Sequence, residues 1–561
     1  MKSKIIKINY LFFVTLFFLI SCSDKKGTVV SISEIWMSSS VANLFVGEEL
    51  SLQVFILPDE ADKGVTWKSS DYEIASVTDD GLVSADSPGI AVITVTALSG
   101  GKNATCIVTV EEEHLPVIRV INVTLNHTVG VLDINETFSL TATVYPTDAT
   151  NQTVVWESAN PDVAEVEDGI VTPKKEGETT ISVITEDGNK KATCKITVID
   201  ASAIKTVDRY ATKETKALFA NLLAIQNVGA MFGHHDGLMY GREWNNVSGR
   251  SDVKEVCGDY PAVYSLDFAE IMDNRYQSAA SSNNIRRRCI LEAYARGEVI
   301  IACIHINNPL TGGDSWDNSN KTVVSEILKD GSAINVKYKT WLDRLANFAN
   351  NLKATDGTLI PVLFRPYHEH TQSWSWWGST CATQAEFIDL WRFTVEYLRD
   401  KKNVHNFLYA ISPQMDGQEA ISRFTYRWPG DDYVDFLGMD CYHGTNTTAY
   451  RSNLTNILHV AGLKGKPCGV TETGIEGIRN NSGEISDYWT VQMLAPLKTV
   501  MQNTGKTVSM VVMWRNQYEA PSLTRNHYFG PWIGHSSASD FVQFYNDPIT
   551  IFSADLPDMY Q

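Results

Sequence analysis

The chain has 561 residues, of which 43% are hydrophobic and 10% aromatic, a composition that predicts about two to four globular domains. Its 66 Asp and Glu outnumber its 47 Lys and Arg, and the formal net charge of −19 argues against a nucleic-acid partner, because phosphate contacts need clustered basic side chains. The nine cysteines show no Cys-x-x-Cys spacing, so neither a zinc ribbon nor a thioredoxin-like motif is indicated.

Residues 1–22 have the pattern of a lipoprotein signal peptide. Lys2, Lys4 and Lys7 form a basic region, and the apolar run that follows them is too short to span a bilayer. The tetrad that ends at Cys22 resembles a bacterial lipobox, in which the cysteine becomes the lipidated first residue of the mature chain. Ordinary signal cleavage is the alternative. We therefore expect an exported protein that is anchored to the outer membrane by lipid alone, on its cell-surface or periplasmic face.

Residues 30–112 and 117–200 contain two copies of one sequence repeat. GLVSADSPGIAVITVTALSGGKNATCIVTV in the first copy aligns with GIVTPKKEGETTISVITEDGNKKATCKITV in the second. Both alternate apolar and polar residues and are rich in Val, Ile and Thr, which predicts two small antiparallel β-sandwiches. Cys106 and Cys194 occupy equivalent places, one in each copy, so neither copy forms an internal disulfide with them. The repeats resemble bacterial immunoglobulin-like group 2 domains, a likeness that implies spacers, with glycan binding as the alternative.

Residues 203–561 have a different pattern, because apolar runs rich in β-branched residues now alternate with amphipathic helical segments. The runs are, in order, GAMFGHH, PAVYSLDF, EVIIACIHIN, LIPVLFRPYHE, HNFLYAIS, DFLGMDCYH, PCGVTETG and VSMVVMWRN. One segment between them, TQAEFIDLWRFTVEYLRDKK, opens with a capping box formed by Thr383 and Glu386. Eight such strands predict an α/β fold, a (β/α)8 TIM barrel. A doubly wound sheet is the alternative, and the polar residues that end nearly all the strands favour the closed ring.

Two of these strands end in a glutamate. LIPVLFRPYHEH contains Glu369, and GKPCGVTETG contains Glu472. Parallel barrels place their chemistry at the C-terminal ends of the strands, so the two carboxyl groups are expected at one rim. Retaining glycoside hydrolysis needs such a pair, one carboxyl group as acid and the other as nucleophile. For either glutamate alone, a solvated carboxylate or a salt-bridge partner is the alternative interpretation.

The motifs around the two glutamates resemble one enzyme family. FRPYHEHTQSWSWWG is similar to the acid/base motif of glycoside hydrolase family 26, and TETG is similar to its nucleophile motif. The resemblance covers residues from about 215 to 550. It implies a retaining enzyme without a cofactor, in which Glu369 is the acid/base and Glu472 the nucleophile. Most members of that family are endo-β-1,4-mannanases.

The same resemblance implies roles for three residues near the catalytic pair. His305, in IHINNP, matches a histidine that lines the −1 subsite, with a buried structural histidine as the alternative. His368 precedes the acid and is expected to orient the nucleophile or to bind substrate. Tyr442, in MDCYH, matches a tyrosine that hydrogen-bonds the nucleophile, which would hold the charge of that carboxylate.

Four further residues are expected to contact substrate by the same likeness. Trp514, in MWRN, matches the tryptophan under the −1 sugar, because a flat aromatic face suits the C–H face of a pyranose. Arg515 beside it is expected at the −2 subsite. Trp316 and Trp374 match tryptophans of the cleft. Core packing is the alternative for each tryptophan.

A metallohydrolase and a non-catalytic glycan-binding protein are the alternatives to a glycosidase. A barrel metallohydrolase would draw its ligands from His234, His235, Asp236, His305, His368 and His370. No standard zinc spacing occurs among these residues, so we predict neither a metal nor another cofactor. An anchored glycan-binding protein without activity is a further alternative.

The prediction from sequence is therefore a monomeric endo-β-1,4-mannanase. Two immunoglobulin-like sandwiches precede a (β/α)8 barrel whose substrate is mannan, galactomannan or glucomannan. A family 26 enzyme that acts on mixed-linkage β-glucan or β-1,3-xylan is the alternative substrate class, because such members keep the same catalytic pair.

Overall fold

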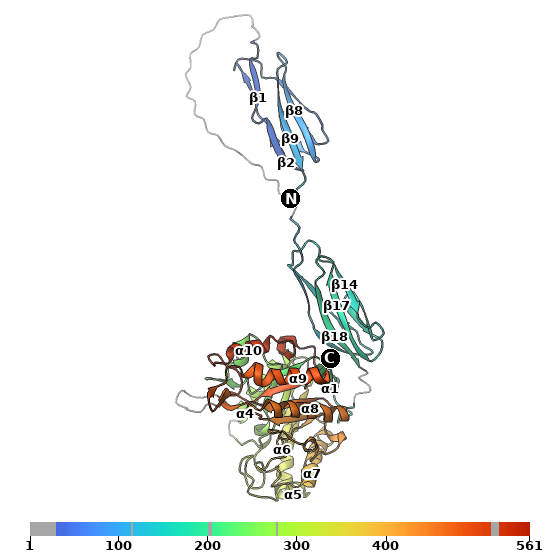
Figure 1. Cartoon of the computed structure of the whole chain (residues 1–561), viewed down its shortest axis with the longest axis vertical. Helices are drawn as coiled ribbons and strands as arrows, with labels where there is room; N and C mark the ends of the chain where they lie inside the picture. Colours follow the sequence, from blue (N-terminus) through green and yellow to red (C-terminus); the bar gives the residue numbers. More distant parts are fainter. Residues whose placement is uncertain (1–29, 114–115, 200–204, 276–278, 518–526) are drawn as a thin grey trace. The chain divides into compact units, whose positions relative to one another are not determined.

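The computed structural model describes residues 30–113, 116–199, 205–275, 279–517 and 527–561 (Figure 1). The signal segment at 1–22, with Cys22, lies outside the described residues, as does the start of the third domain at residue 203. Contacts divide the chain into two units, Met1–Val117 and Ile118–Gln561. No helix in the described part of the chain is both long and apolar enough to cross a bilayer.

The first unit is a β-sandwich built by the first repeat. One sheet has the order β2 (Val41–Phe45), β9 (Asn103–Glu111), β8 (Gly89–Ala97) and β5 (Val65–Ser69). The facing strands are β3 (Glu49–Ser51), β7 (Leu82–Ala85) and β6 (Ala75–Val77), with β1 (Glu34–Met37) paired to β4 (Val54–Leu57). Alternate residues of each strand point inward, so Val83, Ile93 and Cys106 share one closed core.

The second repeat folds the same way at the start of the second unit. Its large sheet has the order β11 (Val129–Asp133), β18 (Lys191–Ile199), β17 (Gly177–Thr185) and β14 (Val154–Ser158). The remaining strands are β12 (Phe138–Ser139), β16 (Ile170–Pro173), β15 (Ala164–Glu167), β10 (Asn122–Leu125) and β13 (Ala142–Tyr145). Cys106 and Cys194 are buried free thiols in the two cores.

The rest of the second unit is a closed parallel barrel, which confirms the predicted fold. Each of the eight expected runs supplies a strand, and β19 pairs with both β22 and β30 to close the ring. The strands are β19 (Ala230–His235), β22 (Val263–Asp267), β23 (Val299–Cys303), β24 (Val362–Arg365), β25 (Phe407–Ile411), β26 (Phe436–Cys441), β27 (Cys468–Thr473) and β30 (Met510–Met513).

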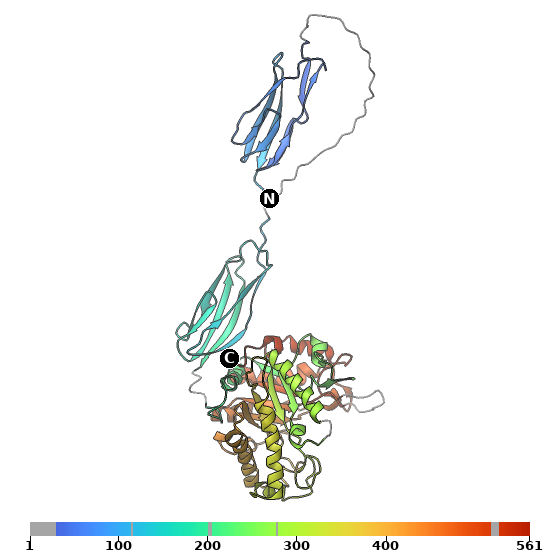
Figure 2. The ribbon, with the colours of Figure 1, turned by 180° about the vertical axis from the view of Figure 1, so that it is seen from behind.

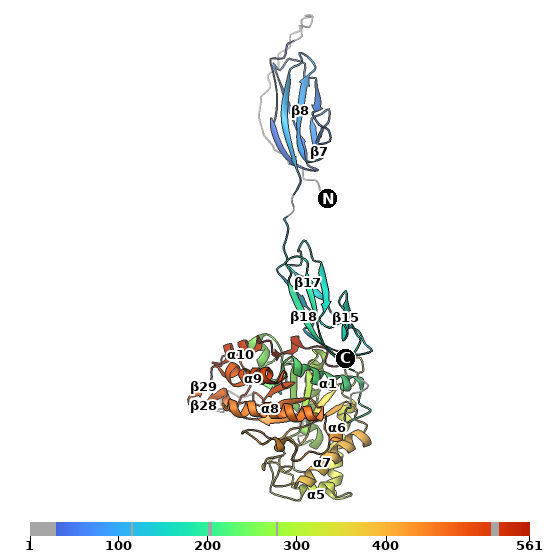
Figure 3. The same cartoon turned by 45° about the vertical axis from the view of Figure 1, so that its right-hand side comes forward.

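Helices cover the outside of the barrel (Figure 2 and Figure 3). They are α1 (Lys213–Ala224), α2 (Asp252–Cys257), α3 (Ala269–Asp273), α4 (Ala279–Ala295), α5 (Val323–Leu328), α6 (Ala333–Asn350), α7 (Gln384–Glu396), α8 (Thr447–Lys464), α9 (Ala495–Thr504) and α10 (Ala538–Tyr545). The expected capping box of Thr383 and Glu386 begins α7, and the helix continues into a π-helical turn at Tyr397–Lys401. That turn lies within the predicted segment and continues its buried face through Leu398.

The barrel has an inner core between its strands and an outer core between its strands and helices. Alternate strand residues face inward or outward, so Val263 belongs to the inner core and Tyr264 to the layer under the helices. Leu218 and Leu222 of α1 pack into the inner core with Met231 of β19. This helix closes the N-terminal end of the barrel, and the polar residues gather at the other end.

Candidate active site

The two candidate catalytic glutamates stand at the C-terminal ends of β24 and β27. Glu472 lies inside β27, whereas Glu369 follows the end of β24 by four residues. The backbone N–H of Glu369 donates to the carbonyl of Ser412, at the end of the neighbouring strand, over 2.9 Å. Tyr367 and Glu369 have φ values of 50° and 53°, in the left-handed region that costs a side chain about 1–3 kcal/mol. The segment is held there by surrounding contacts.

Glu472 is a buried carboxylate with a cation beside it. Its Oε1 accepts a 2.6 Å hydrogen bond from the Tyr442 hydroxyl, and its Oε2 accepts a 2.8 Å bond from Nη2 of Arg365. Burial by itself raises the pKa of Glu472, but the Arg365 charge and the Tyr442 hydrogen bond outweigh it and lower that pKa below its ordinary value. Glu472 is therefore ionised and fixed in orientation.

Arg365, at the end of β24, is held in turn by the carboxylate of Asp440 in β26. Its Nη1 donates to both oxygens of Asp440, over 2.8 and 2.6 Å, and the Ser412 hydroxyl accepts from the same nitrogen over 3.0 Å. Thr471 donates to Asp440 over 2.8 Å. The sequence reasoning missed Arg365 and Asp440, although each stands at the polar end of a predicted strand, in FRPYHE and GMDCYH.

Glu369 has the opposite electrostatic environment. Burial and the negative charge of Glu472 raise the pKa of Glu369 well above its ordinary value, and the hydrogen bond from Trp374 opposes that rise. That bond runs from Nε1 of Trp374 to Oε2 of Glu369 over 2.8 Å. Glu369 therefore retains a proton at a pH at which Glu472 is charged. Two neighbouring carboxyl groups driven to opposite protonation states are the arrangement of an acid and a nucleophile.

His368, His305 and Asp267 are linked in that order by hydrogen bonds. Asp267 accepts from Nδ1 of His305 over 2.7 Å, and Nε2 of His305 faces Nε2 of His368 at 3.1 Å. Burial lowers the pKa of His368 well below its usual value, so this ring is neutral. Because a carboxylate only accepts hydrogen bonds, Nδ1 of His305 carries the hydrogen. Asp267 therefore fixes the tautomer of His305 and, through it, the hydrogen bond to His368. Asp267 is the penultimate residue of PAVYSLDF and was missed from sequence.

Within the described residues, Asp267, Cys303 and His305 form a group whose potential metal-ligand atoms lie within 4.8 Å of one another. Burial raises the pKa of the Cys303 thiol well above its usual value, which disfavours the thiolate that a metal needs. Nδ1 of His305 is already hydrogen-bonded to Asp267. The group is therefore better described as a hydrogen-bonded pair beside a neutral thiol. His370, another candidate ligand, is buried and stacks on Phe387 with ring centroids 4.5 Å apart.

Trp514 and Arg515 follow the last strand of the barrel. The Trp514 ring stacks on His235 with centroids 4.2 Å apart and planes 26° apart. Nη1 of Arg515 lies 3.3 Å from the hydroxyl of Tyr240, which donates to Asp236 over 2.5 Å. The segment after β19 therefore joins the same rim as the segment after β30.

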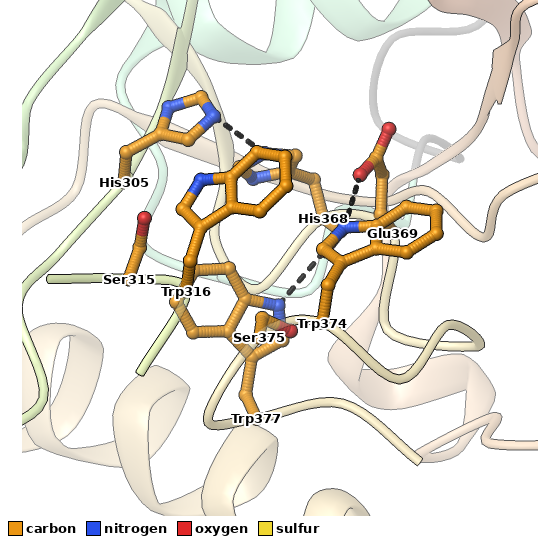
Figure 4. A pocket seen from close by; sticks show the side chains of 8 residues that line it. All are labelled: His305, Ser315, Trp316, His368, Glu369, Trp374, Ser375 and Trp377. Carbon is orange, nitrogen blue, oxygen red and sulfur yellow. Dashed lines mark hydrogen bonds between the residues drawn. The ribbon is translucent and has the colours of Figure 1, made fainter. Parts of the chain in front are cut away.

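A small, partly open pocket lies beside Glu369 (Figure 4). It is lined by His305, Ser315, Trp316, His368, Glu369, Trp374, Ser375 and Trp377. The rings of Trp316 and Trp374 are nearly parallel, with centroids 6.3 Å apart and planes 19° apart. Trp316 is 63% exposed, so an apolar ring is presented at the mouth of the pocket. Flat apolar walls beside a proton donor suit a pyranose ring.

One buried arginine braces the segment that carries Glu369. Arg427 is 2% exposed and donates to the carbonyls of His370, Trp377 and Ala382. These three carbonyls span the turns after β24, so the guanidinium holds that segment in one shape. Nothing in the sequence around Arg427 indicated this role, because its acceptors are backbone atoms.

Comparisons with known proteins show the family of the chain. A GH26 β-mannanase from Bacteroides ovatus is 39% identical, covers 62% of this chain and 98% of its own, and superimposes with a TM-score of 0.55. The chain belongs to glycosyl hydrolase family 26. The model of that family matches residues 207–485, and the model of the bacterial Ig-like domain (group 2) matches residues 33–108 and 119–196.

Further similar proteins are named as mannanases. An endo-β-1,4-mannanase from Cellulomonas fimi is 31% identical, over 64% of this chain and 79% of that one, with a TM-score of 0.57. A mannan endo-1,4-β-mannosidase from Bifidobacterium adolescentis is 29% identical over 365 residues. This family 26 chain spans 35% of the length of the Bifidobacterium protein and 45% of that of a relative from Caldalkalibacillus mannanilyticus.

Proposed function

We propose that the chain is a retaining endo-β-1,4-mannanase that cleaves the backbone of mannan, galactomannan or glucomannan. The observation that carries the proposal is the pair of glutamates at one barrel rim, with the pKa of Glu369 raised and that of Glu472 lowered. The relatives named as mannan endo-1,4-β-mannosidases and GH26 β-mannanases support this choice of substrate.

In this mechanism Glu472 attacks the anomeric carbon while Glu369 donates its proton to the departing glycosidic oxygen. A covalent glycosyl-enzyme forms at Glu472. Glu369, now ionised, then takes a proton from water as that water attacks the anomeric carbon, and Glu472 leaves. Two inversions retain the configuration. Arg365 and Tyr442 keep the attacking carboxylate charged and aimed, as their bonds to its two oxygens indicate.

The neighbouring side chains position the sugar in this proposal. Trp514 provides the apolar floor of the −1 subsite, and His305 and His368 face the same sugar from the adjoining strands. Arg515 serves the −2 subsite. Trp316 and Trp374 serve the leaving-group side, in keeping with their place in the pocket beside Glu369.

The test is product analysis on linear mannan, galactomannan, glucomannan, mixed-linkage β-glucan and β-1,3-xylan. Manno-oligosaccharides of several lengths are expected. Glu472→Ala and Glu369→Ala should each keep the native circular dichroism spectrum and lose more than about 100-fold in kcat/KM. Cleavage of only the glucan or the xylan would contradict the proposed substrate but would be consistent with the proposed mechanism. Silence on all five polymers would favour a glycan-binding protein without activity.

We further propose that the chain is exported and anchored as a monomer to the outer membrane through lipid on Cys22. The basic and apolar segments before Cys22 support this. Two acyl signals or more hold a protein firmly, so the wild-type chain should sediment with membranes. Cys22→Ser should appear in the soluble fraction with unchanged activity. A serine variant that still sediments would contradict the anchor.

A further inference from the structure

The first repeat carries an exposed aromatic pair on its outer surface. Trp36 of β1 and Phe55 of β4 are directly opposite each other in the antiparallel register. Their rings lie 5.5 Å apart between centroids, with planes only 16° apart. Trp36 remains 42% exposed and Phe55 41% exposed. The core of the repeat lies on the other side of these strands, where Met37 and Ile56 are buried. The pair therefore belongs to neither of the cores formed by the described residues of the first unit.

Polar groups border this aromatic pair at both ends of the two strands. Glu34 and Leu57 form the next opposite pair on the same face, and both are exposed. Beyond the other end, Ser38 and Gln53 are exposed. The Ser38 N–H donates to the Gln53 carbonyl over 2.8 Å, and the Gln53 N–H donates to the Ser38 hydroxyl over 3.1 Å. The surface thus offers two flat apolar rings between side chains able to donate and accept hydrogen bonds. Sugar-binding surfaces need this combination, because a pyranose has an apolar face and a hydroxylated edge.

The second repeat serves as an internal comparison for this surface. The register of β10 with β13 places Thr124 opposite Thr143, at the positions that correspond to Trp36 and Phe55. The aromatic pair is therefore dispensable for the fold, because the same pair of strands forms with two threonines. A single exposed aromatic, Tyr145, lies opposite Asn122, which is the next pair on the same face of these two strands. The two repeats share a scaffold and differ at this surface.

The charge of the chain narrows the choice of ligand. Acidic residues outnumber basic ones by 66 to 47, and Glu34 is the charged residue of β1 and β4. An anionic lipid surface attracts clustered Lys and Arg, which these strands lack. A stable dimer buries about 1,000 Å² or more, far beyond what two half-exposed rings supply. A neutral polysaccharide meets neither obstacle, and the barrel in the same chain is proposed to cleave one.

We propose that the outer face of β1 and β4, centred on Trp36 and Phe55, is a second binding site for β-linked mannan. The proposal rests on the proposed function for the identity of the sugar. The two rings stack on the C–H faces of the polymer, and the polar groups at either end bind its hydroxyls. Such a site raises the concentration of polymer near the enzyme without taking part in cleavage.

The test uses the full chain with Glu472→Ala, so that polymer is bound and not digested. In this background Trp36→Thr/Phe55→Thr installs the residues of the second repeat. Tyr145→Thr is the matched control, because it removes a lone exposed aromatic from the other repeat. Depletion onto insoluble mannan should fall about 3- to 10-fold for the double variant and stay unchanged for the control. With Glu472 intact, all variants should hydrolyse short manno-oligosaccharides at the same rate.

Equal depletion by the double variant and its parent would overturn the proposal. So would a concentration-dependent dimer that the double variant abolishes, since the pair would then be a contact between copies. A chain that cleaves no mannan, yet binds it through Trp36 and Phe55, would sink the proposed function and leave this site standing. If the chain cleaves mannan rapidly and the double variant binds it as well as its parent, the proposed function would stand and this second site would be excluded.

Discussion

The chemistry of the site depends on how differently two identical side chains are surrounded. Arg365 and Tyr442 each bond one oxygen of Glu472, whereas Glu369 is bonded at one oxygen by the neutral indole of Trp374. A full positive charge stabilises the ionised carboxylate far more than a neutral donor does. The environments, and not the residue types, therefore distinguish the acid from the nucleophile in the proposed mechanism.

Tyr442→Phe tests the nucleophile's environment. Loss of the hydroxyl removes a hydrogen bond that favours ionised Glu472, so the pKa of that carboxyl group rises. Activity needs Glu472 ionised, and the acidic limb of the pH profile of kcat/KM should move to higher pH. The alkaline limb, set by loss of the Glu369 proton, should stay within a few tenths of a unit. An acidic limb that moves to lower pH would contradict this assignment.

Asp267→Ala tests the positioning of the two histidines. Without its acceptor, Nδ1 of His305 loses the partner that sets the tautomer, and the contact with His368 loses its alignment. We expect kcat/KM to fall about 10-fold or more, as for other residues that hold a functional histidine. His305→Ala combined with Asp267→Ala should lose little beyond His305→Ala alone. Fully additive losses would mean that Asp267 acts by another route.

At the scale of elements, the decisive feature is the segment between β24 and α7. Its residues Tyr367 and Glu369 adopt left-handed backbone conformations, and Tyr367 anchors it through its hydroxyl to Tyr338 and Thr394. Arg427, from the segment after β25, caps three of its carbonyls. Backbone strain is kept only where surrounding contacts over-determine the conformation. Here those contacts come from three different parts of the barrel.

Arg427→Met tests this bracing. The thioether fills part of the space but donates no hydrogen bonds, so three buried carbonyls lose their partner. The free energy of unfolding should fall by about 2–4 kcal/mol, and kcat should fall with it because Glu369 loses its fixed place. Arg423→Met is the control, since Arg423 forms a partly exposed ion pair with Glu419 and donates to one carbonyl, that of Gln414, over 3.1 Å. That variant should change stability by less than about 1 kcal/mol.

At the scale of the whole molecule, the two repeats and the barrel have separate cores. The inner and outer cores of the barrel contain residues from Val207 onward, and the described repeats have their own clusters. Domains with separate cores fold and act as units. The barrel is therefore expected to be the complete catalytic module.

Deletion of residues 30–200 tests that independence. Activity on short soluble manno-oligosaccharides should remain within about twofold, because no described residue of the two repeats belongs to the barrel cores. Activity on insoluble mannan should fall, because Trp36 and Phe55 go with the first repeat. Circular dichroism and thermal unfolding of the shortened chain provide the check. A barrel that fails to fold after the deletion would contradict its independence.

The sequence by itself determined the fold class and the location of the chemistry. Strand runs of period two predicted the sandwiches, and buried runs alternating with helices predicted the barrel, because local pattern follows from burial. The two glutamates were predicted for the same reason, because Glu472 lies near the end of β27, Glu369 follows the end of β24 by four residues, and the strand ends of a parallel barrel share one rim. Motif likeness supplied the family, which the comparisons confirmed.

Only the tertiary structure decided what each charge does. Arg365 meets Asp440 and Glu472 across distances of 75 and 107 residues in sequence, and Asp267 meets His305 across 38. Arg427 binds backbone carbonyls, whose identity no side-chain motif records. The pKa of a carboxyl group depends on burial and on charges a few ångströms away. Those distances arise when the barrel closes, so the opposite states of Glu369 and Glu472 follow from the fold and not from either motif.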